Sequence, residues 1–205
     1  METPPEQASY GIGYSLGEQL KGQNVPEVSL EAVIMGLSDS FEGRPQRIDQ
    51  ATLDAAFEVM RERQSEQQGM IATVNLEKGE KFLADNRERD GVKTTRSGLQ
   101  YEVMRSGEGL SPAASDRVKT HYRGELIDGT VFDSSYDRGQ PVTFAVNRVI
   151  GGWTEALQMM KVGGKWRLFI PSELGYGKRD AAGGRIPPNS VLVFEVELLE
   201  INPRR

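Results

Sequence analysis

Residues 129–157, GTVFDSSYDRGQPVTFAVNRVIGGWTEAL, decide the fold because they combine strand, turn and helix signals in one stretch. Their short apolar runs are separated by Gly, Pro, Asp and Ser, which is typical of strands joined by turns. Only the segment that begins at Trp153 has helical character. Phe, Val, Ile and Trp side chains surround Asp133, and the stretch offers no obvious nucleophile, general base or metal ligand. Any activity here must therefore depend on a mostly apolar site.

The strand pattern extends from about residue 91 to the end of the chain, in short runs of alternating apolar and polar residues. In residues 117–126, Tyr122 faces one side with the apolar residues, while His121 faces the other side with the charged residues. The last run, residues 190–201, alternates in the same way. These runs predict a curled antiparallel sheet, or half barrel, over one short helix.

Residues 1–48 have helical spacing instead. Apolar residues recur every four positions from Ile12 to Leu20, and the segment that starts at Leu30 follows the i, i+3, i+4, i+7 pattern of an amphipathic helix. Ser29 has a side chain suited to cap this second helix. Two short helices cannot bury enough surface alone, so their apolar faces need another surface. A second copy of the chain is the simplest supplier.

Residues 49–91 contain no proline and are rich in good helix formers. The run RERQSEQQG has no large apolar residue, and a helix that is polar all round at this point would bridge separate domains as a rod of roughly 60 Å. Gly69 and Gly79 each cost a helix about 1 kcal/mol relative to Ala, so a break at either glycine is the alternative. The predicted fold class is therefore α+β, with an all-helical N-terminal region, a long connecting helix and a half-barrel domain in residues 92–205.

Composition and charge exclude several classes of partner and function. The net charge is −5, and its acidic and basic residues are well mixed, which argues against a nucleic-acid partner. No apolar run is long enough for a membrane span. The chain has no cysteine, which excludes disulfides and suits the cytosol and the periplasm equally. METPPEQASYG does not resemble a signal peptide, so we expect a cytoplasmic protein as written, or a periplasmic one if a signal peptide was removed.

The sequence gives little support for a metal site, a catalytic nucleophile or a pair of catalytic carboxylates. His121 is the only histidine, and we expect it to face solvent because its neighbours on the same strand face are charged. One histidine without cysteine leaves little for a metal site or a relayed nucleophile. Asp128, Asp133 and Asp137 lie in turn-like contexts, where Asp commonly caps its own backbone, rather than in the paired arrangement of a glycosidase. Neither GYGKRD nor GIGYSLG fits a phosphate-binding loop, and no cofactor is expected.

Three segments resemble the FKBP family of peptidyl-prolyl isomerases: VKTHYRGELIDGTVFDSS, VIGGWTEALQMMKVGGKWRLFIPSELGYG and RIPPNSVLVFEVELLEI. The resemblance covers nearly all of residues 97–201, with several motifs in the family's order. The segment ASYGIGYSLGEQL and the long polar helix are also similar to the dimeric bacterial Mip-like subgroup (macrophage infectivity potentiator type). The resemblance implies that residues 92–205 form an FKBP-type isomerase domain.

The resemblance also implies a pocket with Trp153 as its floor beneath the proline ring. The Ile150 N–H would bind the substrate carbonyl, and Asp133, held by Tyr122 and Arg138, would be the one charged member beside the rotating carbonyl. The implied catalytic residues are Tyr122, Phe132, Asp133, Ile150, Trp153, Tyr176 (through its hydroxyl) and Phe194. The implied substrate- and inhibitor-binding residues are Val142, Phe144, Val149, Ile186 and Arg138.

Alternatives remain open at several of these positions. On composition alone, Phe132, Val149 and Phe194 could be plain core residues, and Trp153 could serve packing. Val142 stands where many family members carry a pocket Phe, so we expect one lower wall and a reduced inhibitor affinity. The loop KRDAAGGR lacks the aromatic residue or His that is frequent in the family, which leaves the peptide preference open.

An apolar pocket can catalyse this reaction without a nucleophile. Amide resonance sets a rotation barrier of ~18–20 kcal/mol, and X–Pro isomers exchange over tens of seconds or longer. The planar amide is more dipolar than the twisted one, so water stabilises the planar form more. A dry cavity shaped for the twisted form lowers the barrier, and about 10⁴-fold acceleration requires ~5–6 kcal/mol of selective binding.

We expect a V-shaped homodimer, in which the N-terminal helices interlock and two isomerase domains face a common cleft. Unfolded, proline-containing client proteins would be gripped by that cleft, because paired sites hold a chain longer than one site. Macrolide inhibitors of the family are the other expected ligands. The alternative function is a chaperone or binding module with a vestigial isomerase pocket.

Overall fold

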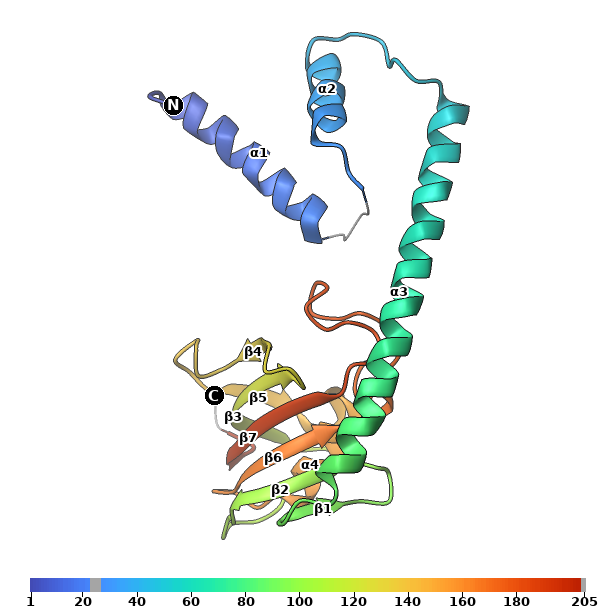
Figure 1. Ribbon diagram of the computed structural model, residues 1–205. Coiled ribbons are helices and arrows are strands. Elements are labelled where there is room, and N and C mark those ends of the chain that lie inside the picture. Colours follow the sequence, from blue (N-terminus) through green and yellow to red (C-terminus); the bar gives the residue numbers. More distant parts are fainter. Residues whose placement is uncertain (23–26, 204–205) are drawn as a thin grey trace. The chain divides into compact units, whose positions relative to one another are not determined.

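The computed structural model describes residues 1–22 and 27–203 (Figure 1). Within these residues the fold is α+β, as predicted, with four α-helices and one seven-stranded antiparallel sheet. The chain divides into two compact units, Met1–Met70 and Ile71–Arg205. The predicted helical region includes residues 23–26, and the predicted isomerase domain ends at residue 205; both positions lie outside the described residues.

The first unit is helical. It contains α1 (Pro4–Gly22), α2 (Leu30–Phe41) and the first part of α3 (Gln50–Asn86). The Ser29 hydroxyl caps α2 as predicted, because its Oγ accepts a hydrogen bond from the Ala32 N–H at 3.2 Å. Satisfying one of the free N–H groups at the start of a helix in this way stabilises it by about 1 kcal/mol.

One buried acid fixes the end of α2. The Asp39 carboxylate accepts hydrogen bonds from Arg47 at 2.5 and 2.9 Å and from Arg44 at 2.6 Å. The hydrogen bonds from Arg47 and then Arg44 lower the pKa of Asp39 to about 2. The acid therefore stays ionised and ties the segment after α2 back to the helix.

The apolar faces of the first unit are largely uncovered within a single chain. None of the residues of α1 is buried, and Phe41 at the end of α2 keeps 90% of its surface exposed. The large apolar residues of this unit that remain exposed include Tyr10, Ile12, Tyr14, Val28, Leu30, Ile34, Met35, Leu37, Phe41, Ile48, Phe57 and Val59. The two short helices thus leave their apolar stripes without a covering surface, as their length led us to expect.

Helix α3 is continuous over its 37 residues. It passes through Gly69 and Gly79 without interruption, so the alternative of a break at either glycine is not observed. Its middle is exposed, in agreement with the all-polar run. Within the described residues, none of the helices has both the length and the hydropathy that a membrane crossing requires.

The second unit is built on the sheet. Its strands are β1 (Val92–Thr94), β2 (Gln100–Arg105), β3 (Arg117–Leu126), β4 (Val131–Ser134), β5 (Val142–Ala145), β6 (Lys165–Ile170) and β7 (Leu192–Ile201). They follow the order β1-β2-β6-β7-β3-β4, and β5 pairs with β3 in addition. Every pairing is antiparallel. The long strands β3 and β7 lie side by side at the centre, where Tyr122 pairs with Val196.

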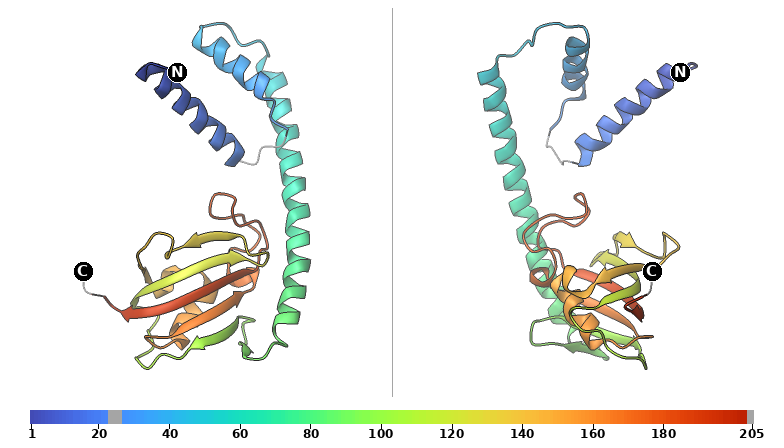
Figure 2. Two further views of the ribbon diagram at one scale, coloured as in Figure 1. Left: turned by 60° about the vertical axis from the view of Figure 1, so that its left-hand side comes forward. Right: turned by 180° about the vertical axis from the view of Figure 1, so that it is seen from behind.

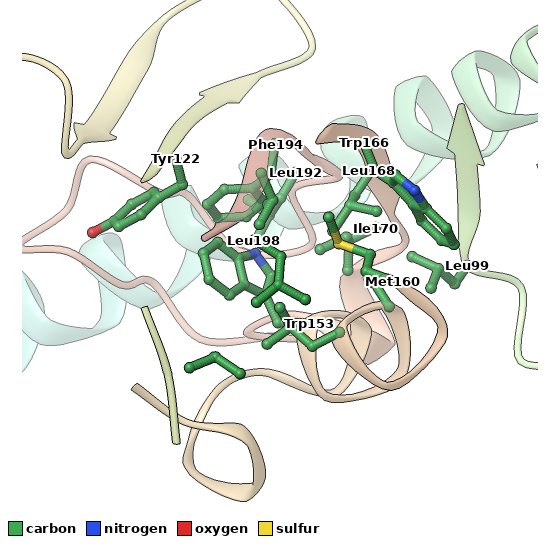
Figure 3. Packing of buried hydrophobic residues seen from close by; sticks show 14 of the residues in the cluster. Leu99, Tyr122, Trp153, Met160, Trp166, Leu168, Ile170, Leu192, Phe194 and Leu198 are labelled. Atoms are coloured by element: carbon green, nitrogen blue, oxygen red, sulfur yellow. The ribbon is translucent and has the colours of Figure 1, made fainter. Parts of the chain in front are cut away.

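The helix α4 (Gly151–Met159) lies against one face of this sheet (Figure 2). Two single-turn 3-10 helices, η1 (Val146–Arg148) and η2 (Ser172–Leu174), are also present and have no clear sequence signal. The predicted alternation is confirmed, because Tyr122 of β3 is buried whereas Arg123 is exposed. Buried side chains from β3, β6, β7 and α4 form one core, part of which is shown in Figure 3.

The C-terminal part of α3 belongs to the second unit and packs on it. Asn86 Nδ2 donates to Gln100 Oε1 at 2.7 Å in a buried hydrogen bond, and Asn189 Nδ2 donates to the Ala72 carbonyl at 3.1 Å. In return, Asn75 of α3 donates to the Pro188 carbonyl at 2.9 Å. Polar bonds from the helix thus hold the loop that precedes β7.

Candidate active site

A pocket of about 620 Å³ opens beside α4 in the second unit. This volume lies within the range of small-molecule sites. It collects side chains from β3, β4, β5, η1, α4, β7 and the loop before β7. Ten of the twelve residues implied by the resemblance line it: Tyr122, Phe132, Asp133, Phe144, Val149, Ile150, Trp153, Tyr176, Ile186 and Phe194.

Trp153 forms an aromatic floor in this pocket. The residue is 4% exposed, and its ring meets three others edge to face, with centroid distances of 5.2 Å to Tyr122, 5.6 Å to Phe144 and 5.3 Å to Phe194. Figure 3 shows Tyr122, Trp153 and Phe194 close together at one end of the core. Edge-to-face packing favours such rings beyond the area they bury. The site is therefore a rigid extension of the core that opens outward.

Gly124 of β3 makes room for the pocket walls. A Cβ at this position would lie 2.5 Å from Phe194 Cε1 and 2.6 Å from Phe132 Cε2. These distances are too short for any side chain. The two rings, which meet edge to face at 5.4 Å, therefore depend on the glycine beneath them.

The charged part of the site is a triad of Tyr122, Asp133 and Arg138. The Tyr122 hydroxyl donates to Asp133 Oδ2, and Arg138 donates to Asp133 Oδ1 and, at 2.8 Å, to the Tyr122 oxygen. Burial by itself raises the pKa of Asp133, but the hydrogen bonds from Tyr122 and Arg138 outweigh it and hold the pKa below its usual value. Burial, followed by the hydrogen bond to Asp133, raises the pKa of Tyr122. The acid is thus ionised and the phenol protonated near neutral pH.

Several polar groups of the pocket lack an internal partner. Among the described residues, no acceptor is found for the Ile150 N–H, the buried Trp153 Nε1–H or the Tyr176 hydroxyl. Ile150 immediately precedes α4, where its extended backbone leaves the N–H outside the helix. Groups of this kind are the usual means by which an apolar pocket orients a polar ligand.

The structure differs from the expected site in two respects. Val142, which pairs with Thr120 in β5 and packs against the core, does not line the pocket. The expectation that Asp133 is the one charged member is wrong, since Arg148, Arg179 and Arg185 also line the pocket. Arg138 does not line the pocket itself. It donates hydrogen bonds to Asp133 and Tyr122, which do.

The residues that sequence reasoning missed share no motif. They are Arg148, Gly175, Arg179, Ala182 and Arg185. The charged, glycine-rich loop KRDAAGGR supplies three of them, but its position over the pocket depends on tertiary contacts. For Arg179 and Arg185, the signal in the sequence was the high proportion of charged residues in this loop.

His121 does not belong to the site. It is half-buried, because its ring stacks on Tyr136 at 4.6 Å and its Nδ1 is 2.9 Å from Ser135 Oγ. His121 lies on the polar face of β3, opposite Tyr122 and away from the site, as predicted, although the Tyr136 ring covers part of it. Within the described part of the chain, no group of three His, Cys, Asp or Glu side chains could hold a metal ion.

Comparison with known proteins agrees with this geometry. Residues 109–199 match the family described as "FKBP-type peptidyl-prolyl cis-trans isomerase", and residues 5–103 match the "domain amino terminal to FKBP-type peptidyl-prolyl isomerase". The chain belongs to the FKBP-type peptidyl-prolyl cis-trans isomerases. Its activity is therefore the acceleration of rotation about X–Pro peptide bonds.

Relatives of this isomerase match it over almost its whole length. It is 48% identical to the FKBP-type 22 kDa peptidyl-prolyl cis-trans isomerase of Escherichia coli, over 98% of this chain and 97% of that protein. It is 38% identical to the peptidyl-prolyl cis-trans isomerase Mip of Coxiella burnetii, over 100% of this chain and 90% of that protein. The crystal structure of FkpA from Escherichia coli is similar with a TM-score of 0.73 and 37% identity, covering 99% of both chains.

Proposed function

We propose that the pocket over Trp153 is the isomerase site and that two copies of the chain hold unfolded client proteins between them. The observation that carries the site assignment is the opening above an aromatic floor, lined by apolar walls and by free hydrogen-bond donors. A proline ring stacks on Trp153, and the walls exclude water from the rotating amide. Exclusion of water removes the solvation that favours the planar form.

Each polar group has a role in this proposal. The Ile150 N–H binds the carbonyl of a neighbouring residue and fixes the peptide in place. The Tyr176 hydroxyl donates to a second carbonyl at the rim. Asp133 lies beside the carbonyl that rotates, and its hydrogen bonds to Tyr122 and Arg138 keep its orientation constant. Preorganised groups of this kind need no rearrangement when the amide twists.

The two tryptophans provide a matched test of the site. Trp153 is the proposed floor, whereas Trp166 is a core residue that does not line the pocket. In an isomerisation assay with a proline tetrapeptide, Trp153→Phe should lower kcat/KM at least about tenfold, and Trp166→Phe should leave it near the wild-type value. Equal effects of both substitutions would contradict the assignment.

An inhibitor experiment addresses the same site. A macrolide ligand of the family should compete with the peptide for the pocket, and Trp153→Phe should weaken its binding. Val142 does not line the pocket, so Val142→Phe should not raise the affinity through a new pocket wall. Inhibition that is insensitive to Trp153→Phe would place the macrolide elsewhere.

The proposed dimer is supported by the first unit. Its exposed apolar residues on α1 and α2 need a partner surface, and a second copy of the same helices supplies one of matching size and character. Equilibrium sedimentation at micromolar concentration should show a dimer. Phe41→Glu should shift it to the monomer, while Ser40→Glu, which places the same charge at the adjacent exposed position, should not. A monomeric wild-type protein would rule out the arrangement.

Client holding follows from the dimer. The monomeric Phe41→Glu protein should lose the ability to suppress aggregation of an unfolded protein, yet retain isomerase activity on tetrapeptides, because Phe41 lies in the first unit. Aggregation suppression that survives in the monomer would contradict the paired-site proposal. Absence of tetrapeptide activity in the wild type would instead favour a binding module with a vestigial pocket.

A further inference from the structure

Three arginine side chains line the pocket: Arg148 at the end of η1, and Arg179 and Arg185 in the loop before β7. All three are exposed at its mouth. Among the described residues, none of them is within ion-pair distance of an acid. They contrast with Arg138, which is bound to Asp133 in the same site.

The positive charge is therefore concentrated at the mouth, because Asp180, the acid of the same loop, is exposed and does not line the pocket. Among the residues that the structure describes, Asp133 is the one acid that lines the pocket, and it is paired with Arg138. The mouth is thus positive, although the chain as a whole carries a net charge of −5. A cleft lined by one sign of charge raises the local concentration of ligands with the opposite sign.

The loop that carries two of these arginines is held in place. Ala181 and Ile186 form an isolated antiparallel bridge, with N–H to carbonyl bonds of 2.9 and 3.1 Å. Arg185 Nε donates to the Ala182 carbonyl at 3.0 Å, which leaves its two terminal nitrogens available to a ligand. At the end of the loop, Asn189 is bonded to α3. Arg179 lies two residues before Ala181 and Arg185 one residue before Ile186, so both extend from backbone that the bridge holds in place.

We infer that this arginine rim gives the isomerase a preference for prolines flanked by an acidic residue. This inference rests on the proposed assignment of the pocket as the isomerase site. A peptide whose proline occupies the floor has its neighbouring Cα atoms only ~3.8 Å along the chain, so a Glu or Asp side chain beside the proline lies at the mouth. Contacts between exposed charges are screened by salt and act mainly on the encounter. The expected preference is about three- to tenfold in kcat/KM at low ionic strength.

The test compares isosteric peptides. Four blocked tetrapeptides carry Glu or Gln immediately before or immediately after the proline. Their isomerisation is measured by NMR exchange, which needs no auxiliary protease with a charge preference of its own. The ratio of kcat/KM for Glu over Gln should be at least about three at one position and should approach one near 1 M salt, where the Debye length is ~3 Å. A ratio of one at both positions in low salt would overturn the inference.

Substitutions at the three arginines test whether they cause the preference for an acidic residue. Replacing Arg148, Arg179 and Arg185 together by Gln should bring the ratio to about one. Lys178→Gln is the matched control, because Lys178 lies in the same loop and is exposed but does not line the pocket. It should keep the wild-type ratio. An unchanged ratio in the triple variant, or an equal loss in Lys178→Gln, would overturn the inference.

A charge-reversal variant distinguishes a change in substrate preference from a loss of folding. Arg179→Glu combined with Arg185→Glu should reverse the preference, so that a Lys peptide is converted faster than its Gln counterpart. Misfolding cannot produce such a reversal, so this variant remains informative if the triple variant is unstable. If the neutral Gln peptide is not accelerated even by the wild type, the assignment of the isomerase site itself fails. If it is accelerated without any charge preference, only the inference about the rim fails.

Discussion

The hydroxyl of Tyr122 and the carboxylate of Asp133 are joined by a 2.5 Å hydrogen bond at the edge of the pocket, and Arg138 binds both. Tyr122 comes from β3 and Asp133 from the adjacent β4, so the sheet register sets this contact. The ring of Tyr122 meanwhile packs edge to face on Trp153. One residue therefore connects the apolar floor with the charged edge of the site.

Tyr122→Phe should isolate the contribution of this hydrogen bond. The ring contacts with Trp153 remain, while Asp133 loses a donor. Hydrogen bonds to charged groups contribute about 1.5–3 kcal/mol, and part of this loss should appear as a decrease in kcat/KM of about tenfold. Tyr101→Phe is the control, because Tyr101 stacks on Trp166 outside the pocket and should leave the rate unchanged. Wild-type activity in Tyr122→Phe would mean that the hydrogen bond does not support catalysis.

The isomerase rate should be independent of pH between about 5 and 9. The pKa of Asp133 is held below its ordinary value, so the acid is ionised throughout this window, and the raised pKa of Tyr122 keeps the phenol protonated. The rate should fall only under more acidic conditions, as Asp133 is protonated. NMR exchange on a peptide without titrating groups measures this profile. A midpoint between pH 5 and 9 would show that another group controls the rate.

The lowered pKa of Asp133 also makes the free energy of unfolding depend on pH. A carboxyl group whose pKa is lowered by folding stabilises the native state above its unfolded pKa, and this contribution is lost as the pH falls through the folded value. The contribution of Asp133 is therefore complete at neutral pH and decreases only in acid. Asp133→Asn should accordingly lower the midpoint of urea unfolding at pH 7 more than at pH 3. An equal difference at both pH values would contradict the lowered pKa.

The features that could be predicted from the sequence are those that depend on local residue patterns. The alternation in β3 placed Tyr122 inside and Arg123 outside, and the N-cap of α2 at Ser29 is a local signal. The aromatic pocket residues followed from family motifs. The arginines at the mouth did not, because the position of Arg179 and Arg185 depends on the bridge between Ala181 and Ile186.

The packing of α3 could be predicted from the sequence only in part. Phe82 is an apolar contact of the helix, since its ring centroid lies 6.0 Å from that of Phe169 in β6. The other contacts are made by Asn75, Gly79 and Asn86, which give no apolar signal. A small or polar residue gives no sign of burial until its partner is known. Val142 illustrates the opposite error, since a position aligned with a pocket residue of the family packs against the core here.

Gly124→Ala should close the pocket from below. Its Cβ would overlap Phe194 and Phe132, and the rings can move only toward the cavity or into the dense core. Overpacking of this kind costs about 1–3 kcal/mol. We expect kcat/KM to decrease more than tenfold, together with a lower unfolding midpoint. Normal activity would show that the rings can adjust without narrowing the site.

The two glycines of α3 should respond to alanine with opposite signs. A Cβ at Gly69 meets no atom within 4 Å, so Gly69→Ala should gain about 1 kcal/mol of helix propensity. A Cβ at Gly79 would lie 2.7 Å from Cγ2 of the buried Val191, whose branched side chain has little freedom to move. The overpacking cost of about 1–3 kcal/mol then outweighs the gain in propensity.

Fluorescence distinguishes the two substitutions, because Trp153 and Trp166 both lie in the second unit. In urea, Gly79→Ala should lower the midpoint of the fluorescence transition, whereas Gly69→Ala should leave it unchanged or raise it. Helix content measured by circular dichroism serves as the control that α3 forms in both variants. A midpoint that rises in Gly79→Ala would mean that Val191 yields readily, and that the contact between α3 and the isomerase domain is looser than the 2.7 Å approach implies.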